Sequence, residues 1–162
     1  MSAIFSGSFD PITNGHLDKI RRFRALWVDE RLIMAVADDY CAQKKTLFSF
    51  DERISQIKEI VSDIDNIEVD RFSGLISEYA KKKHAMFIIR GVRNTVDFNY
   101  EMEMALHNRR LGDIETVFIP TDEKYFIVSS SAVRLIATLG GDADWMIPRR
   151  VRNDLREKLA TI

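Results

Sequence analysis

The chain has 162 residues, which is enough for one domain with a sizeable hydrophobic core. Hydrophobic residues make up 46% and charged residues 30%, proportions that are typical of a globular protein and argue against disorder. The net charge of −1 argues against a general binder of nucleic acid or of a membrane surface. Cys41 is the only cysteine, so the chain cannot form an intrachain disulfide or a cysteine-based metal cluster.

The sequence shows neither the pattern of a secretory leader nor an apolar run of about 18 residues, the length that spans a membrane. No linker, repeat or low-complexity stretch interrupts it. We therefore expect a reduced, cytoplasmic, soluble protein with a single domain over residues 1–162.

Five short apolar runs rich in β-branched and aromatic residues predict strands, at Ala3–Ser6, Arg31–Ala37, Ile67–Phe72, Met86–Arg90 and Thr116–Pro120. Helical patterns lie between and after them, at Leu17–Trp27, Ile54–Val61, Leu75–Lys82, Asp97–Leu111, Ser129–Leu139 and Arg149–Leu159. Ser49 followed by Glu52 predicts a capping box before the second of these helices. Strands that alternate with helices predict right-handed crossovers, so the fold class is α/β, a doubly wound domain with a mostly parallel five-stranded sheet.

In such a sheet, ligands bind beyond the carboxyl ends of the strands. Four unusual segments follow strands and should lie along that edge: Gly7–His16, Ala37–Lys45, Arg90–Arg93 and Thr121–Ser131.

The first segment, GSFDPITNGH, joins a strand to a helix. Gly7 permits a close approach that a side chain would obstruct, and Asn14 is a candidate cap of the helix that carries His16. The free N–H groups of that helix start suit an anion, and its dipole disfavours a protonated His16 while a neutral imidazole can still donate a hydrogen bond. The alternative is a structural turn with a surface histidine.

The other segments carry positive charge or hydroxyls. Lys44 and Lys45 together are, on their own, more typical of a solvated turn. Arg90 and Arg93 flank a Gly91 that lets the backbone approach a ligand, and the planar fork of arginine suits phosphate; ion pairs with Asp97 or Glu101 are the alternative.

The serines Ser129, Ser130 and Ser131 open a helix, with Arg134 one turn on. Three hydroxyls at a helix start offer donors to phosphate, although on their own they indicate little more than a good N-cap.

GSFDPITNGH resembles the phosphate-binding signature T/H-x-G-H of the nucleotidyltransferase superfamily, with Thr13 and His16 at the ends of TNGH. Followed by KK, by RGVRNTVDFNYE and by SSSAVR, it resembles bacterial phosphopantetheine adenylyltransferase over essentially the whole chain, and RGVRNTVDFNYE is the part specific to that family. The resemblance implies a Rossmann-like nucleotidyltransferase fold. It also implies a reaction in which 4′-phosphopantetheine attacks ATP directly and in line, giving dephospho-coenzyme A and pyrophosphate.

The resemblance further implies roles for individual residues. His16 would be catalytic and would stabilise the α-phosphate in the transition state. The acceptor would be bound by Ser8, Lys44, Leu75, Ile76 and Arg90. ATP would be bound by Ser8, Phe9, His16, Gly91, Val92, Arg93, Glu101, Tyr125, Phe126, Ile127, Val128, Ser129, Ser130 and Ser131.

Because the attacking phosphate is already ionised, the reaction needs alignment and charge stabilisation rather than a general base. Mg²⁺ would arrive with ATP, and we expect no metal site made by protein carboxylates. The resemblance also implies a homohexamer, with the helix at Asp97–Leu111 contributing to an interface, and dephospho-coenzyme A and coenzyme A as ligands. Neither nucleic acid nor a membrane is an expected partner.

Three positions depart from the family pattern. Ser8 replaces the commoner threonine but keeps the hydroxyl, and Asn99 replaces an acidic residue of the motif. The loop Asp38–Gln43 lacks the usual small residues, and its two aspartates could repel phosphate near Lys44.

Two other functions remain open. A nicotinamide-mononucleotide adenylyltransferase has a similar opening motif, but Arg90, Arg93 and the following DFNYE favour the pantetheine enzyme. A non-catalytic nucleotide-binding module on the same fold is the second, and it would have no need of a transition-state histidine at position 16.

Overall fold

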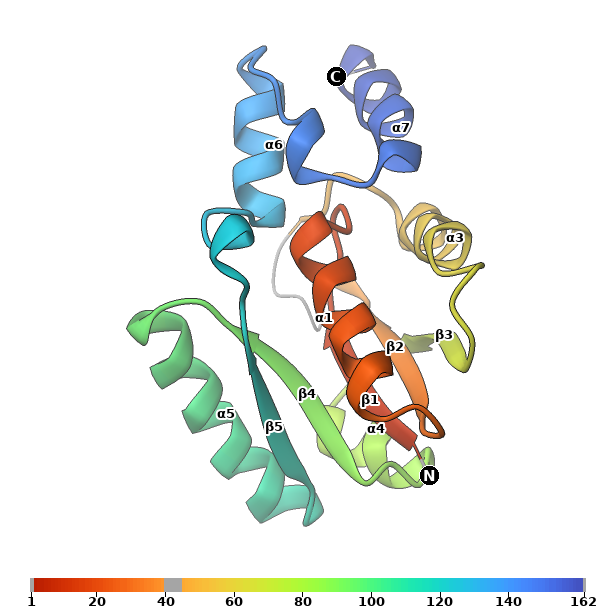
Figure 1. Cartoon of the computed structure of the whole chain (residues 1–162), viewed down its shortest axis with the longest axis vertical. Coiled ribbons are helices and arrows are strands. Elements are labelled where there is room, and N and C mark those ends of the chain that lie inside the picture. The colour runs from red at the N-terminus through yellow and green to blue at the C-terminus, as the bar shows by residue number, and fades with distance from the viewer. Residues whose placement is uncertain (1, 40–44, 162) are drawn as a thin grey trace.

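The computed structural model of the chain describes residues 2–39 and 45–161. Its sheet contains five strands, all parallel, in the order β3-β2-β1-β4-β5, which confirms the predicted α/β class and doubly wound sheet (Figure 1). The strands are β1 Ser2–Gly7, β2 Arg31–Ala37, β3 Ile67–Phe72, β4 Phe87–Val92 and β5 Glu115–Pro120. The helices are α1 Asn14–Leu26, α3 Phe50–Ile60, α4 Ile76–Lys82, α5 Thr95–Gly112, α6 Ser130–Thr138 and α7 Arg149–Ala160, with short 3₁₀ turns at Glu123–Tyr125 and Asp144–Met146.

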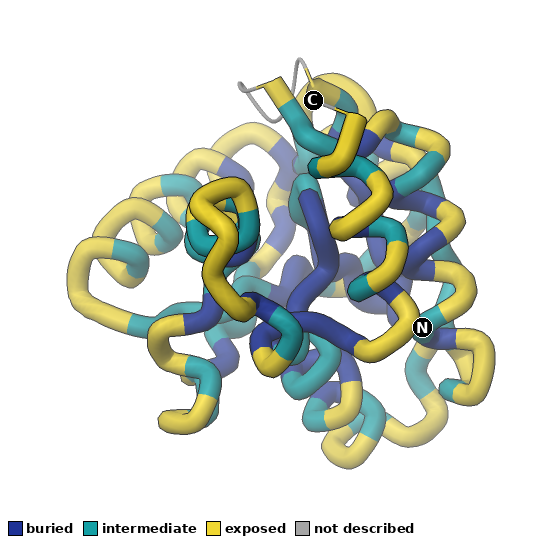
Figure 2. Tube along the Cα trace, turned by 90° about the horizontal axis from the view of Figure 1, so that it is seen from above, coloured by how far each residue is buried: buried dark blue, intermediate teal, exposed yellow. Residues whose placement is uncertain are grey.

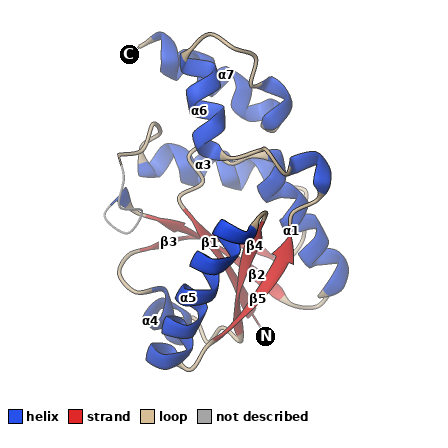
Figure 3. Cartoon of the chain, turned by 90° about the vertical axis from the view of Figure 1, so that its left-hand side faces the viewer, coloured by secondary structure: helices blue, strands red, loops and turns tan. Residues whose placement is uncertain are grey.

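The sheet is covered on both faces because its strands are apolar on both sides. In β2 the side chains of Leu32, Met34 and Val36 join one buried cluster, whereas Ile33 and Ala35 join the other. Helices α1 and α3 pack on the first face, and α4 and α5 lie on the second (Figures 1 and 3). Figure 2 shows the buried strands at the centre of the molecule with exposed helical turns around them.

The chain winds outward from the middle of the sheet in both directions. It passes from β1 through β2 to the edge strand β3, and then returns to place β4 and β5 on the other side of β1. The order therefore reverses between β1 and β4, and such a switch point opens a crevice at the carboxyl ends of the strands. Helices α6 and α7 lie beyond this same end (Figure 1).

Most element bounds lie within a few residues of the predicted ones. Helix α5 begins at Thr95, two residues earlier than predicted, because the Asn94 side chain caps it by accepting the N–H of Asp97 at 2.9 Å. Helix α4 begins at Ile76 rather than Leu75, and the capping box of Ser49 with Glu52 is confirmed.

Candidate active site

The loop between β1 and α1 is held from within by buried groups. The backbone of Phe9 adopts a left-handed φ of 47° and its ring is buried against Gly7, where a Cβ would meet the ring at 3.2 Å. The carboxylate of Asp10 is fully buried and accepts the N–H groups of Leu47 and Phe48 at 2.9 Å each. The loop is thus fixed to the segment that follows the undescribed residues 40–44.

Arg53 fastens the same loop from α3. Its side chain is fully buried, and the guanidinium donates to the carbonyl oxygens of Ser8 at 2.9 Å and Ala37 at 2.7 Å and to Asp39 at 2.7 Å. The carboxyl ends of β1 and β2 therefore share one buried cation, which holds the loop backbone in place.

Thr13, not Asn14, is the N-cap of α1, so the prediction for Asn14 was wrong. The Thr13 side chain accepts the N–H of His16, whereas Asn14 donates from Nδ2 to the carbonyl of Trp145 at 2.8 Å. Both residue types are good caps. The choice falls on Thr13 because the His16 ring folds back and accepts the N–H of Thr13, which completes a capping box.

This cap fixes the proton of a neutral His16. Nδ1 lies 3.0 Å from the N atom of Thr13, and a backbone N–H can only donate, so Nδ1 is an acceptor. The ring proton of the neutral form is then on Nε2. The edge-to-face contact with the Phe9 ring, at 5.1 Å between centroids, further orients the imidazole.

A cavity of about 580 Å³ lies at the switch point between β1 and β4. The starts of α1 and α6 both contribute to its wall, so two helix N-termini bring their positive dipole ends to one cavity. Of the predicted site residues it is lined by Ser8, Phe9, His16, Arg90, Gly91, Arg93, Glu101, Val128, Ser129, Ser130 and Ser131. Three of the four expected loops thus meet at one edge.

Several predicted site residues lie elsewhere. Within the described part of the chain, the cavity wall does not include Leu75, Ile76, Val92, Tyr125, Phe126 or Ile127. Leu75 and Ile127 are exposed, at 57% and 68%. Lys44 and most of the loop Asp38–Gln43 lie outside the described residues.

Both arginines of the cavity form the ion pairs that the sequence left open. Arg90 Nε lies 2.8 Å from Glu101, and its Nη1 donates to the Ser6 carbonyl at 2.8 Å; Arg93 Nε lies 2.7 Å from Asp97. These contacts position the guanidinium groups without removing them from the wall of the cavity.

The serine run at the start of α6 is tied to the opening loop. The serine run was expected to supply an N-cap, and Ser129 is that residue: it accepts the N–H of Ala132. The Ser130 hydroxyl donates to the Pro11 carbonyl at 2.8 Å. Arg134 contacts Asp10 at 3.0 Å, so its charge neutralises the buried carboxylate of the loop.

Sequence reasoning missed Lys19, which also lines the cavity. Burial lowers the pKa of the Lys19 ammonium from 10.5 to about 8. The available signal was spacing, because Lys19 follows His16 by three residues and must share its face of α1.

Carboxylates are poorly placed to hold a metal ion. Among the described residues, no group of three or more His, Cys, Asp or Glu side chains could do so. Asp97 and Glu101, which line the cavity, are each paired with an arginine.

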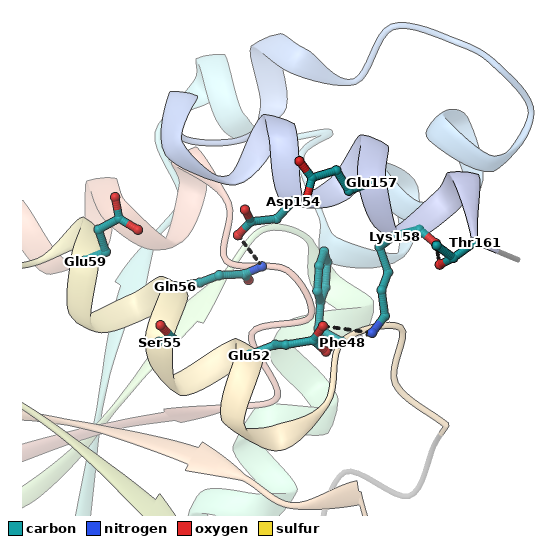
Figure 4. A pocket seen from close by; sticks show the side chains of 9 residues that line it. All are labelled: Phe48, Glu52, Ser55, Gln56, Glu59, Asp154, Glu157, Lys158 and Thr161. Atoms are coloured by element: carbon teal, nitrogen blue, oxygen red, sulfur yellow. Dashed lines mark hydrogen bonds and ion pairs between the residues drawn. The ribbon is translucent and has the colours of Figure 1, made fainter.

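A second cavity, of about 460 Å³, lies between α3 and α7 (Figure 4). Its wall carries four carboxylates, those of Glu52, Glu59, Asp154 and Glu157, and Lys158 is paired with Glu52 at 2.9 Å. A wall of this charge disfavours a polyanionic ligand.

Comparison with known proteins agrees with this geometry. A family described as cytidylyltransferase-like matches residues 4–136. A phosphopantetheine adenylyltransferase of Desulfosudis oleivorans is 46% identical over 99% of this chain and 94% of its own length, and one of Caldanaerobacter subterraneus is 47% identical over 96% of each. The chain belongs to the phosphopantetheine adenylyltransferase family.

Solved structures support the fold of this phosphopantetheine adenylyltransferase family member. A bifunctional NMN adenylyltransferase/ADP ribose pyrophosphatase of Francisella tularensis, complexed with AMP and a manganese ion, superimposes with a TM-score of 0.67 at 15% identity over 98% of this chain. The chain spans about half (49%) of that protein, and the likeness shows the fold alone. Within the described residues, no helix is long and apolar enough to cross a membrane.

Proposed function

We propose that the chain transfers the adenylyl group of ATP to 4′-phosphopantetheine, giving dephospho-coenzyme A and pyrophosphate, as one nucleotidyltransferase domain over residues 1–162. The observation that carries the proposal is the cavity at the switch point, where two helix N-termini meet His16, Arg90 and Arg93. The chain is also 46–47% identical to two phosphopantetheine adenylyltransferases. Both substrates are polyanions, and the cavity offers the positive groups that such ligands need.

The chemistry is direct in-line attack of the acceptor phosphate on the α-phosphorus of ATP. The second pKa of a phosphate monoester is about 6, so the nucleophile is ionised at neutral pH and needs no base. His16 donates from Nε2 to an oxygen of the α-phosphate, where negative charge develops in the transition state. The N–H groups at the starts of α1 and α6 hold the remaining phosphate oxygens.

Arg90, with Lys44, holds the phosphate of the acceptor, and Leu75 and Ile76 contact its pantetheine arm outside the cavity. ATP contacts the other side, which includes Phe9, Gly91 and Arg93. The remaining proposed ATP contacts are Ser8, Val92, Glu101 and the run from Tyr125 to Ser131. Mg²⁺ arrives bound to the phosphates of ATP and supplies charge neutralisation there.

We also propose that the protein is a homohexamer in the cytoplasm and that coenzyme A is a further ligand. Helix α5 supports the assembly, because Phe98, Met102 and Leu106 recur every four residues along it and are at least 36% exposed. Light scattering after size exclusion should give six times 18.8 kDa; a monomer would contradict the assembly and leave the activity untouched.

The test of function is pyrophosphate release from ATP with one acceptor at a time: 4′-phosphopantetheine, nicotinamide mononucleotide or glycerol 3-phosphate. We expect rapid release only with 4′-phosphopantetheine and a product with the mass of dephospho-coenzyme A. Preference for nicotinamide mononucleotide would replace the proposed acceptor. Absence of turnover above a His16→Ala control with every acceptor would indicate a binding module.

A further inference from the structure

Lys19 is a buried cation in the wall of the cavity. It lies on α1, one turn after His16, and only 7% of its surface is exposed. Its ammonium has three donors, of which one reaches the Gly15 carbonyl at 3.0 Å. Among the ion pairs formed by residues 2–39 and 45–161, none includes Lys19.

Neither neighbouring carboxylate forms an ion pair with Lys19 in the described residues. Asp97 is paired with Arg93 at 2.7 Å, and Asp18 lies 3.7 Å from Arg22. Burial is the largest effect on the pKa of Lys19 and lowers it to about 8. Asp18 and Asp97 raise this pKa, and Arg93 and Arg22 lower it. An ammonium that is desolvated and not paired is costly to the fold unless a ligand supplies the missing partner.

Gly91 holds this lysine at the wall of the cavity. A Cβ at position 91 would collide with Cδ and Cε of Lys19, so the missing side chain leaves room for the lysine stem. Gly91 was expected to let the backbone approach a ligand, and here its open side is occupied by Lys19. The Lys19 side chain lines the same cavity as His16, Gly91 and Arg93.

We propose that Lys19 is an additional ligand of the nucleotide and that ATP binding transfers a proton from solvent to its Nζ. The proposal rests on the proposed ATP site. The triphosphate brings negative charge into a cavity whose own carboxylates are already paired, and opposite charge nearby favours the protonated amine. The two N–H donors not used by Gly15 then bind the nucleotide.

Calorimetry of ATP binding at pH 8.5, in two buffers of different ionisation enthalpy, measures this proton. At that pH the phosphates of ATP are fully ionised and take up none. A rise of one to two pKa units at Lys19 gives an uptake of about 0.5 to 0.7 proton, and ATP affinity falls about five- to tenfold from pH 7 to pH 9. Lys19→Met should lose the uptake and the pH dependence, whereas Lys58→Met, an exposed lysine on α3, should keep both.

Each result decides a different question. If the natural protein binds and turns over ATP without proton uptake, or if Lys19→Met retains the uptake, the role of Lys19 is overturned and the proposed function stands. If the natural protein binds no ATP, the proposed function fails instead.

A second measurement needs no variant, should Lys19→Met not fold. Reductive methylation of the natural protein at pH 8, followed by peptide mass spectrometry, should modify Lys19 more slowly when ATP is present. The Lys58 peptide serves as the internal reference. Equal rates at Lys19 with and without saturating ATP would contradict the proposed contact.

Discussion

Replacing His16 by alanine separates transition-state stabilisation from nucleotide binding. The ring has one nitrogen occupied by the N–H of Thr13, at 3.0 Å, and its neutral form can donate only from the other. That donor meets charge that develops in the transition state and is smaller in bound ATP. We therefore expect His16→Ala to reduce kcat strongly while leaving most of the ATP affinity.

The expected magnitude has two parts. Loss of one donor to a developing oxyanion typically costs about 10²–10³ in kcat, equivalent to about 3–4 kcal/mol. The variant also leaves the N–H of the buried Thr13 without its acceptor, which should lower the free energy of unfolding by about 1 kcal/mol. Asn14→Ala is the matched control, because it removes the 2.8 Å bond to Trp145 at the same helix start. It should lose similar stability and no more than about twofold in kcat.

The assay is steady-state pyrophosphate release at saturating ATP and acceptor, with ATP affinity measured by calorimetry and stability by urea unfolding. An equal loss of ATP affinity and of kcat in His16→Ala would show that the ring binds the ground state as tightly as the transition state. Loss of kcat in Asn14→Ala as large as in His16→Ala would show that the helix start, rather than the imidazole, carries the effect. Either outcome refutes the assignment.

Three further predictions test the surroundings of this histidine. Arg90→Lys keeps the charge but loses the planar guanidinium that contacts both Ser6 and Glu101. Separate titrations should show that acceptor binding is weakened about tenfold or more and that ATP binding changes far less. A larger effect on ATP would reassign Arg90. Arg53→Met leaves carbonyls of the opening loop unpaired and should cost about 3–5 kcal/mol in urea unfolding; a cost under about 1 kcal/mol would contradict its anchoring role. In pH profiles, kcat should be level from pH 7 to 9 and fall below about pH 6, where the acceptor phosphate takes up a proton. The KM for ATP should rise above pH 8 as Lys19 loses its proton. An acidic limb of kcat that vanishes in His16→Ala would instead make His16 a proton acceptor.

The sheet could be predicted from the sequence because its strands are continuous apolar runs. Residues 32–37 contribute to both hydrophobic clusters, and a continuous apolar run of this length is typical of a strand buried on both faces. The loops at the carboxyl ends followed from this sheet, and with them His16, Arg90 and Arg93. These three residues line one cavity because parallel strands end at a common edge.

The cap of α1 and the buried cations could not be predicted in the same way. Thr13 and Asn14 have similar capping preferences, and only the ring of His16, which is not the usual partner in a capping box, decides between them. Charged residues are assigned to the surface by default. Arg53 is buried because carbonyls from β1 and β2, far away in sequence, converge on it. Lys19 is buried because position 91 is a glycine.

The hydrogen-bond partners of Arg53 and Lys19 distinguish a cation that stabilises the fold from one that is available to a ligand. Arg53 donates to Ser8, Ala37 and Asp39 and contributes no surface to the cavity, so its hydrogen bonds are satisfied within the protein. Lys19 has one intrahelical acceptor and a lowered pKa, and it does line the cavity. A fold gains nothing from a desolvated ammonium that lacks a counterion, since an apolar side chain of the same volume would pack there at lower cost. The incomplete set of partners around Lys19 is therefore explained if the missing acceptor belongs to the nucleotide.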